Sequence, residues 1–494
     1  MNFTGKMPGK FLIITCLIFM WAIALLNCRV FIKDRLFLSA LLSALLIALI
    51  YVISRYMVKM SPLFFSVILF AAAFALKTSV ALYYNVPPTS DFLKFYNAAV
   101  QAAKGDFSFS SNSYFSLWSY QTGIVFYYAM VIKLFGNGLL FLKIGNCLFM
   151  AGSNVLLYLI SRTLASEKYA RFISLLYMIY PAPYFLASAL TNQHISNFFI
   201  LLGIYSFISR RKANFRSVIP SAFFIAVGNA LRPQGIIVIM AITGCLLLNM
   251  LGSGDKKQIV NLILSAVCVL IIYTCTMQGL SLGVRAVGLN ANGLENRFAL
   301  YKFVVGLNYE TNGGYSRSDA EKLIYISDPK TRDKKSLQLI KERISRPEKL
   351  ARLILKKQNL MWAIPDDSVD WGFSFYKNTG VKIFGKNVSY PVFRRFVQNV
   401  EKCFYIFILF MAISGLMARF RTQNNQTAFI VILIMLLLNF GIYSLIEIQN
   451  RYRDFQVMLM FLVSAAGIEM FIDYGSARIS ALKSGNTHFN SNDI

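Results

Sequence analysis

A carboxylate and an arginine at the ends of apolar blocks are the first candidates for chemistry. Asp91 follows the third apolar block and begins a short amphipathic segment. The dipole of a helix favours an ionised carboxylate in its first turn, where the group can act as a base or hold a hydroxyl. Arg232 occupies a predicted turn between two blocks, where its guanidinium can bind a phosphate. The structural alternatives are a helix-capping acid and an interface anchor.

The connection between the last two apolar blocks contains a polar cluster of Glu447, Asn450, Arg451, Tyr452 and Arg453. This connection lies on the predicted outer side of the membrane, where lysine and arginine are usually sparse. Two arginines there indicate that an anion is bound, and we expect Arg451 and Arg453 to hold a phosphate. Glu447 and Tyr452 are expected to contact the rest of the substrate.

Further polar candidates lie within or beside other apolar blocks. Asn192, Gln193 and His194 stand where two blocks meet. They are predicted to bind substrate or, alternatively, to form a polar helix start beside lipid headgroups. Lys77, deep in the third block, either extends to the membrane interface or contacts a phosphate. Tyr96, on the amphipathic segment that Asp91 begins, is a further predicted substrate contact.

Together these residues indicate a site for a lipid-linked phosphate. A polyprenyl phosphate is a good leaving group, so sugar transfer from it needs little acid catalysis. It needs a carboxylate to activate the acceptor hydroxyl, cations to stabilise the departing phosphate and an apolar groove for the lipid. The chain has no P-loop, no H-E-x-x-H and no nucleotide-binding glycine motif. ATP-driven transport and zinc proteolysis therefore have no support.

The elements that must position these side chains are membrane-spanning helices. Of the 494 residues, 56% are hydrophobic, and the mean hydropathy is +0.55. The apolar residues gather in blocks long enough to cross ~30 Å of hydrocarbon as helices. A block such as residues 36–53 has no polar face, which excludes a soluble helical core. The predicted blocks are 11–27, 36–53, 63–83, 120–136, 139–160, 170–187, 190–208, 217–231, 234–251, 258–278, 402–418, 427–446 and 454–472.

Basic connections predict the orientation of the chain. The segments rich in lysine and arginine, which should be cytoplasmic, are 209–216, 252–257, 418–423 and the tail from 475. Four complete crossings between 120 and 208 would place the basic segment 209–216 on the outer side, although its charge predicts the cytoplasmic side. One of these four blocks must therefore be short, re-entrant or merged with its neighbour, and the pair within 120–160 is the first candidate. We therefore expect an all-α integral membrane protein with about 12 transmembrane helices, in a range of 11–13.

Four regions follow from this reading. They are an N-terminal transmembrane catalytic module (1–278) with an outer loop (84–118), an extracytoplasmic cap (279–401), C-terminal transmembrane helices (402–474) and a cytoplasmic tail (475–494). The outer loop contains an amphipathic helix over 91–105, with Ser90 as N-cap and Gly105 as its stop. The cap contains two amphipathic helices, 331–345 and 347–362.

The charge and the cysteines exclude other classes. The net charge of +28 reflects cytoplasmic basic loops and attraction to anionic lipid, because the basic residues cluster at the ends of apolar blocks, and a nucleic-acid partner is not expected. The seven cysteines lie in or beside apolar blocks without metal-binding spacing, so no structural disulfide is expected. The first block reads as a retained span, since no A-x-A cleavage site follows it.

Several short motifs resemble the GT-C superfamily of integral-membrane glycosyltransferases, and most closely the bacterial relatives of protein O-mannosyltransferases and lipid A aminoarabinose transferases. The motifs are 90-SDFLKFYNAAVQAAKGD-106, 118-WSYQTGIVFYYAMVIKLFG-136, 181-PAPYFLASALTNQH-194, 231-LRPQGIIVI-239 and 451-RY-452. The resemblance implies a GT-C-like core of about 7 shared spans, a polyprenyl-phosphate-sugar donor and Asp91 as the carboxylate that activates the acceptor.

Two departures from the family pattern concern metals. Many members have an acidic residue near Asn192, Gln193 and His194, and many have a paired Asp-Glu where Asp91 is followed by Phe92. The resemblance therefore leaves dependence on a divalent metal open, and we expect a metal-independent enzyme without a cofactor.

The sequence thus predicts a bacterial, multi-pass plasma-membrane glycosyltransferase with cytoplasmic termini and an extracytoplasmic active site. Its partners would be a polyprenyl-phosphate sugar, a cell-envelope glycan, lipid or protein acceptor, a synthase for the donor and a flippase. The alternatives are a polysaccharide polymerase or O-antigen-ligase-type enzyme, and a lipid-linked-oligosaccharide flippase or transporter. A transporter is disfavoured because the polar residues crowd one membrane face and no inverted repeat is visible.

Overall fold

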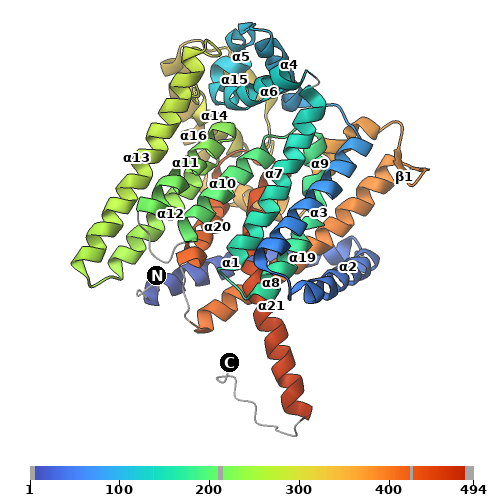
Figure 1. Ribbon diagram of the computed structural model, residues 1–494. Helices are drawn as coiled ribbons and strands as arrows, with labels where there is room; N and C mark the ends of the chain where they lie inside the picture. Colours follow the sequence, from blue (N-terminus) through green and yellow to red (C-terminus); the bar gives the residue numbers. More distant parts are fainter. Residues whose placement is uncertain (1–5, 137, 210–214, 423–426, 484–494) are drawn as a thin grey trace.

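The structure is a computed structural model that describes residues 6–136, 138–209, 215–422 and 427–483. Nearly all of this part of the chain is helical (Figure 1). Within it, eight helices are long and apolar enough to cross a membrane. They are α1 (Lys6–Lys33), α2 (Phe37–Met57), α3 (Pro62–Tyr83), α7 (Gly138–Ser161), α13 (Lys256–Ala286), α19 (Tyr390–Thr422), α20 (Thr427–Leu445) and α21 (Asp454–Lys483). The expected all-α membrane fold is confirmed.

Three shorter apolar helices pack among the long ones: α10 (Gln193–Ile208), α11 (Phe215–Leu231) and α12 (Gly235–Leu251). They complete the run of helices that precedes α13. Most residues of the basic connection 209–216, the connection 423–426 and the tail after residue 483 lie outside the described residues.

The predicted block 120–136 belongs to the pair that the parity argument suspected, and it is short. It forms α6 (Thr122–Phe135), whose 14 residues extend only about 21 Å, less than the hydrocarbon core. The helix packs against α4 (Ser90–Ala103) and lies at the same end of the molecule (Figure 1). Gly136, at φ 67°, ends it and the chain turns into α7.

The predicted block 170–187 is broken in the middle. It forms α8 (Glu167–Met178) and α9 (Ala182–Ser188), because Pro181 has no N–H to continue the helix. The carbonyl of Met178 at the break accepts hydrogen bonds from Tyr184 Oη at 2.5 Å and Lys77 Nζ at 3.1 Å. Among the described residues, eight helices are long and apolar enough to span, with three shorter apolar helices beside them, so the expected number of about 12 spans stays a prediction.

The centre of the bundle is α21, of whose most apolar window 78% is buried, against 17% for α2. It crosses α19 at two glycines. A Cβ on Gly467 would lie 1.8 Å from the carbonyl oxygen of Met411, and one on Gly415 2.5 Å from that of Val463. Only glycine permits this approach, so α19 and α21 form a rigid centre for the other helices.

The outer loop folds at the end of the bundle opposite to the start of α1 and the end of α21 (Figure 1). Besides α4, it contains η1 (Ser108–Ser111) and α5 (Ser113–Leu117), and η2 (Ser119–Gln121) connects it to α6. Gly105, at φ 84°, ends α4 as expected. The expected N-cap at Ser90 is wrong: Ser90 is the first helical residue, at φ 54°, and Thr89 precedes it without a side-chain cap.

The cap lies between α13 and α19, both of which extend past the predicted ends of their blocks. It consists of α14 (Ala299–Gly306), α15 (Arg317–Ile324), α16 (Pro329–Ile344), α17 (Pro347–Trp362), α18 (Ser368–Phe373), η3 (Ser374–Tyr376) and the hairpin β1 (Val381–Ile383) with β2 (Lys386–Val388). The two strands are antiparallel, with Lys382 opposite Asn387. The amphipathic helices predicted over 331–345 and 347–362 are confirmed as α16 and α17.

Candidate active site

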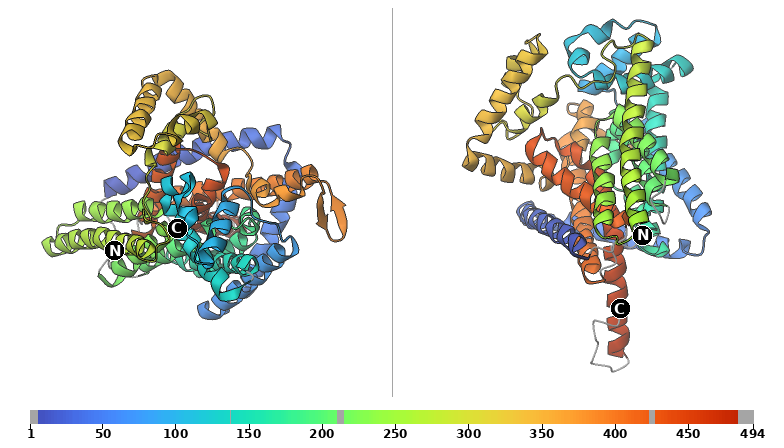
Figure 2. Two further views of the ribbon diagram at one scale, coloured as in Figure 1. Left: turned by 90° about the horizontal axis from the view of Figure 1, so that it is seen from above. Right: turned by 90° about the vertical axis from the view of Figure 1, so that its left-hand side faces the viewer.

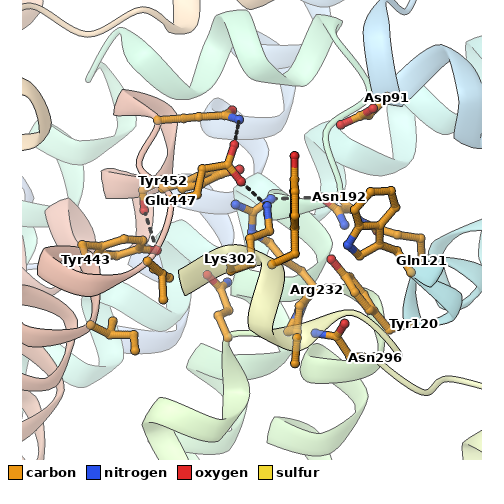
Figure 3. Close-up of a pocket in the computed structure, with 18 of the residues that line it drawn as sticks. Asp91, Tyr120, Gln121, Asn192, Arg232, Asn296, Lys302, Tyr443, Glu447 and Tyr452 are labelled. Atoms are coloured by element: carbon orange, nitrogen blue, oxygen red, sulfur yellow. Dashed lines mark hydrogen bonds and ion pairs between the residues drawn. The ribbon is translucent and has the colours of Figure 1, made fainter. Parts of the chain in front are cut away.

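A cavity of about 1280 Å³ opens among the outer loop, the cap and the outer-loop ends of the spans. Figure 3 shows part of its lining. α4, α5 and η2 form one side, and α14 with the segment after α20 forms another. The cavity continues as an apolar groove between the first turns of α12 and the last turns of α20, which is lined by Ile236, Ile237, Met240, Leu437, Leu438, Gly441, Ile442 and Leu445.

The groove opens toward the region that lipid would occupy. Ile236 and Met240 are 47% and 51% exposed, and Leu445 is 41% exposed. Because a helix rises 1.5 Å per residue, the segment from Leu437 to Leu445 extends about 12 Å along α20. The cavity therefore combines a polar chamber with an apolar slot that enters the membrane zone.

Arg451 is the most unusual cation of the polar chamber. It is 5% exposed, and its Nη1 atom has no hydrogen-bond partner among the described residues. Its guanidinium lies 4.0 Å from the ring centre of Trp371 and 4.9 Å from that of Phe92, while Nε donates to Gln449 Oε1 at 2.8 Å. A buried guanidinium with an unpaired N–H is costly unless an anion completes its hydrogen bonds.

Arg232 is the second cation of the chamber. It stands at the end of α11, with its guanidinium 5.2 Å from the ring centre of Tyr452. Its Nη1 donates to Asn192 Oδ1 at 3.3 Å, and Asn192 Nδ2 donates to the Leu231 carbonyl at 2.8 Å. Tyr452 lies beside both arginines, since the Arg451 guanidinium is 5.6 Å from its ring centre. Three predicted residues, Arg232, Asn192 and Tyr452, are thus brought together.

Lys302 of α14 is a cation that sequence reasoning missed. It forms an ion pair with Glu447, 145 residues away, and the Glu447 N–H donates to the Lys302 carbonyl at 2.9 Å. Burial lowers the pKa of Lys302, but the nearby Tyr452 and Glu447 outweigh it and raise the pKa above its usual value. No local motif marks this lysine, because only the tertiary fold places α14 against the end of α20.

Asp91 lies in the first turn of α4 and lines the cavity, apart from the Lys302–Glu447 pair (Figure 3). Its side chain is 41% exposed and 3.4 Å from Lys94 Nζ. Tyr114 stands nearby, and burial, followed by the charge of Asp91, raises the pKa of this tyrosine well above its usual value. The phenol therefore stays neutral, and the carboxylate keeps access to the cavity.

Arg453 does not support the phosphate-binding role that we expected for it. It is 1% exposed, lies away from the cavity and pairs with Asp366 and Glu401, each at 3.2 Å. Both carboxylates bind its guanidinium. Arg453, just before α21, is thereby joined to Asp366 of the cap and to Glu401 of α19.

Four other candidates do not line the cavity. Lys77 caps the break between α8 and α9 and lies 4.5 Å from the Tyr184 ring centre, so a phosphate role does not fit it. Gln193 supports the site indirectly, because its Nε2 donates to the Arg451 carbonyl at 3.0 Å. His194 is buried in the bundle, and Tyr96 packs against an aromatic cluster of the outer loop.

The described residues contain no group of three His, Cys, Asp or Glu side chains that could hold a metal ion. Metal independence stays a prediction, because residues outside this part of the chain and substrate groups are not tested by that observation.

Fold and site together define an all-α membrane protein with a cationic cavity beside a lipid-facing groove. No family model and no curated protein sequence matches the chain. Among solved structures it is similar to the archaeal oligosaccharyltransferase AglB from Archaeoglobus fulgidus in complex with an inhibitory peptide and a dolichol-phosphate, with a TM-score of 0.47 and 11% identity. The similarity covers 85% of this chain and 52% of that chain, so this chain spans about half the length of that neighbour.

With a TM-score of 0.47, this similarity carries no argument about the fold class or activity of this chain. An identity of 11% identifies neither a substrate nor a reaction.

Proposed function

We propose that this chain is a membrane glycosyltransferase that moves a sugar from a polyprenyl-phosphate carrier to a cell-envelope acceptor. The observation that carries the proposal is the unpaired, buried Nη1 of Arg451 at the wall of a cavity that continues as a groove toward lipid. An anionic headgroup would satisfy this N–H, and a lipid tail would fill the groove.

The phosphate of the donor would bind between Arg451 and Arg232. Both guanidiniums lie beside the Tyr452 ring, at 5.6 and 5.2 Å from its centre, and we propose that one phosphate contacts both. Lys302 contributes a third, partly compensated positive charge through its pair with Glu447. Fixed cations in a partly desolvated chamber stabilise the charge that develops on a departing phosphate.

The polyprenyl tail would lie in the groove between α12 and α20. Its lining is apolar, and the exposed side chains of Ile236, Met240 and Leu445 offer an entry from the lipid phase. A donor that stays anchored in the membrane can then present its phosphate to the chamber without leaving the bilayer.

The acceptor would bind on the side of Asp91. Aromatic side chains of the outer loop and cap, Tyr114, Trp118 and Trp371, line the cavity there. In the reaction, the acceptor oxygen bonds to the anomeric carbon of the sugar while the bond from that carbon to the phosphate oxygen breaks. The acceptor proton passes to the Asp91 carboxylate, and the polyprenyl phosphate departs with the bonding electron pair to the cations.

The proposal extends to location and partners. The chain would act in a bacterial plasma membrane with the cavity on the outer side, supplied by a cytoplasmic synthase and a flippase. A polymerase or ligase that uses a polyprenyl diphosphate is the alternative enzyme. Comparing mono- and diphosphate-linked donors with the purified protein separates the two.

The test compares the envelope glycans of strains that carry Asp91→Asn, Arg451→Ala or a full deletion. Asp106→Asn is the matched control. Asp106 lies in the same loop, but it accepts a hydrogen bond from the Ser108 N–H and does not line the cavity. We expect Asp91→Asn and Arg451→Ala to lose the sugar that the deletion loses, with normal amounts of protein in the membrane. Asp106→Asn should keep it.

Intact glycans in Asp91→Asn would reduce this residue to a helix-capping acid. Intact glycans in both site variants would refute the proposed glycosyl transfer, and a transport role would then become the leading explanation.

A further inference from the structure

α17 is anchored to the end of the apolar helix α20 by Lys357. Lys357 Nζ donates to three carbonyls, those of Gly306 at 2.8 Å, Ser444 at 2.9 Å and Ile446 at 2.8 Å. Two of these belong to the last turn of the apolar helix α20 and to the residue just after it. Because α20 ends where its apolar sequence ends, α17 is fixed at the boundary between hydrocarbon and headgroups.

The two faces of α17 differ in composition. Leu353, Lys357 and Met361, spaced by four residues, are buried against the protein. Lys349, at the N-terminal end of this row, and Arg352 and Lys356 beside it are exposed, and Leu355, on the side opposite to the row, is 70% exposed. A leucine flanked by lysine and arginine on an exposed helical face is typical of helices that lie in a membrane interface.

α16 continues this basic, partly apolar surface. Lys330, Lys334, Lys335 and Lys341 are exposed, and Leu337 is 46% exposed on the same helix. None of these lysines, and none of the exposed cations of α17, forms an ion pair within the described residues. In the right-hand view of Figure 2, α17 projects sideways from the bundle, and α16 rises beside it to the level of the outer loop.

We propose that α16 and α17 bind anionic phospholipid headgroups of the leaflet on the side of the candidate active site. The charge is complementary, the exposed leucines can enter the headgroup zone, and the hydrogen bonds of Lys357 hold the surface at the correct depth. A soluble polyanion would satisfy the lysines but would leave the leucines in water. This inference does not depend on the proposed glycosyl transfer.

The test places the full chain in nanodiscs of phosphatidylcholine alone or mixed with phosphatidylglycerol, and measures hydrogen exchange of segment 345–358. We expect phosphatidylglycerol to slow exchange in this segment by about tenfold, and the effect to disappear in high salt, because screening removes headgroup attraction. The variant Lys349→Glu/Arg352→Glu/Lys356→Glu should lose the effect while α20 exchanges as in the wild type.

Lys256→Glu/Lys257→Glu is the matched control, since these exposed lysines begin α13 at the opposite end of the bundle. It should keep the response of segment 345–358. Equal exchange in both kinds of nanodisc, or a response that persists in the triple variant, would overturn the inference. If phosphatidylglycerol did not slow exchange, but polyglutamate added to phosphatidylcholine nanodiscs did, the ligand of this surface would be a soluble polyanion and the inference would be overturned.

Discussion

Arg451 and Arg453 are two positions apart in the sequence but have different surroundings. Both belong to η4 (Asn450–Arg453), a 3₁₀-helix, in which residues i and i+2 point about 120° apart. Arg451 therefore lines the cavity, and Arg453 points toward Asp366 and Glu401. The sequence indicated two anion-binding arginines here, and only the local helix type decides which of them faces a carboxylate of the protein.

Replacing Arg453 should therefore affect stability. Arg453→Met leaves Glu401 and Asp366 buried without their cation, a loss that typically costs about 3–5 kcal/mol. We expect a clear drop in the unfolding temperature in detergent, partly restored by adding Glu401→Gln.

Arg451→Lys should unfold at the wild-type temperature and lose sugar transfer, because a lysine cannot form the paired hydrogen bonds of a guanidinium. Equal unfolding temperatures for Arg453→Met and the wild type would contradict this division.

Asp367, beside the Arg453 cluster, should make stability depend on pH. Burial, and then the charge of Asp366, raises the pKa of Asp367 to about 6. The folded chain thus keeps this proton to a higher pH than the unfolded chain, so stability falls as pH rises from about 4 to about 6. Asp367→Asn should lose less stability than the wild type between these limits, by up to about 3 kcal/mol. If the unfolding free energy changed by the same amount between these two pH values in the wild type and in Asp367→Asn, the raised pKa of Asp367 would be refuted.

At the scale of the elements, the apolar blocks predicted most helices, and the exceptions have physical causes. The block that became α6 is as apolar as a span but too short to be one, and it packs on α4. The block 170–187 is split at Pro181, and neighbouring side chains must satisfy the carbonyl of Met178 at the break. Lys77 and Tyr184 do so here. Lys77 thus has a structural role that the sequence cannot distinguish from phosphate binding.

The groove between α12 and α20 gives a prediction at this scale. A Cβ on Gly441 would meet no atom within 4 Å, and this residue lines the groove. Gly441→Leu should therefore fold normally but occupy the space of a lipid tail, and we expect the KM for a polyprenyl-phosphate donor to rise about tenfold, the effect of roughly 1.4 kcal/mol. Gly283→Leu on α13, equally open, is the control and should leave KM unchanged. An unchanged KM in Gly441→Leu would place the lipid elsewhere.

At the scale of the whole molecule, the sequence separated the cap from the spans but did not show what the cap covers. The change from apolar to polar composition predicted a cap over 279–401, whereas α13 continues to Ala286 and α19 already begins at Tyr390. The contact of Lys302 with Glu447 was not predicted, because it joins segments 145 residues apart. The same holds for Trp371, which α18 brings against Arg451. Local patterns thus indicated three residues that line the cavity, Asp91, Arg232 and Arg451, while long-range packing brings Lys302 and the aromatic side chains to it.

The orientation of the molecule is the last quantity that the basic loops predict, and labelling with a membrane-impermeant maleimide tests it. Tyr325→Cys places a thiol at a position that is 81% exposed on the cap, and Lys257→Cys places one at the start of α13, at the other end of the bundle. The exposed native Cys275 is first replaced by serine to remove its background. Because lysine and arginine concentrate in cytoplasmic loops, we expect intact cells to label Tyr325→Cys and not Lys257→Cys, with both labelled after permeabilisation. The reverse pattern would place the cavity on the cytoplasmic side, where no cell-envelope acceptor can reach Asp91.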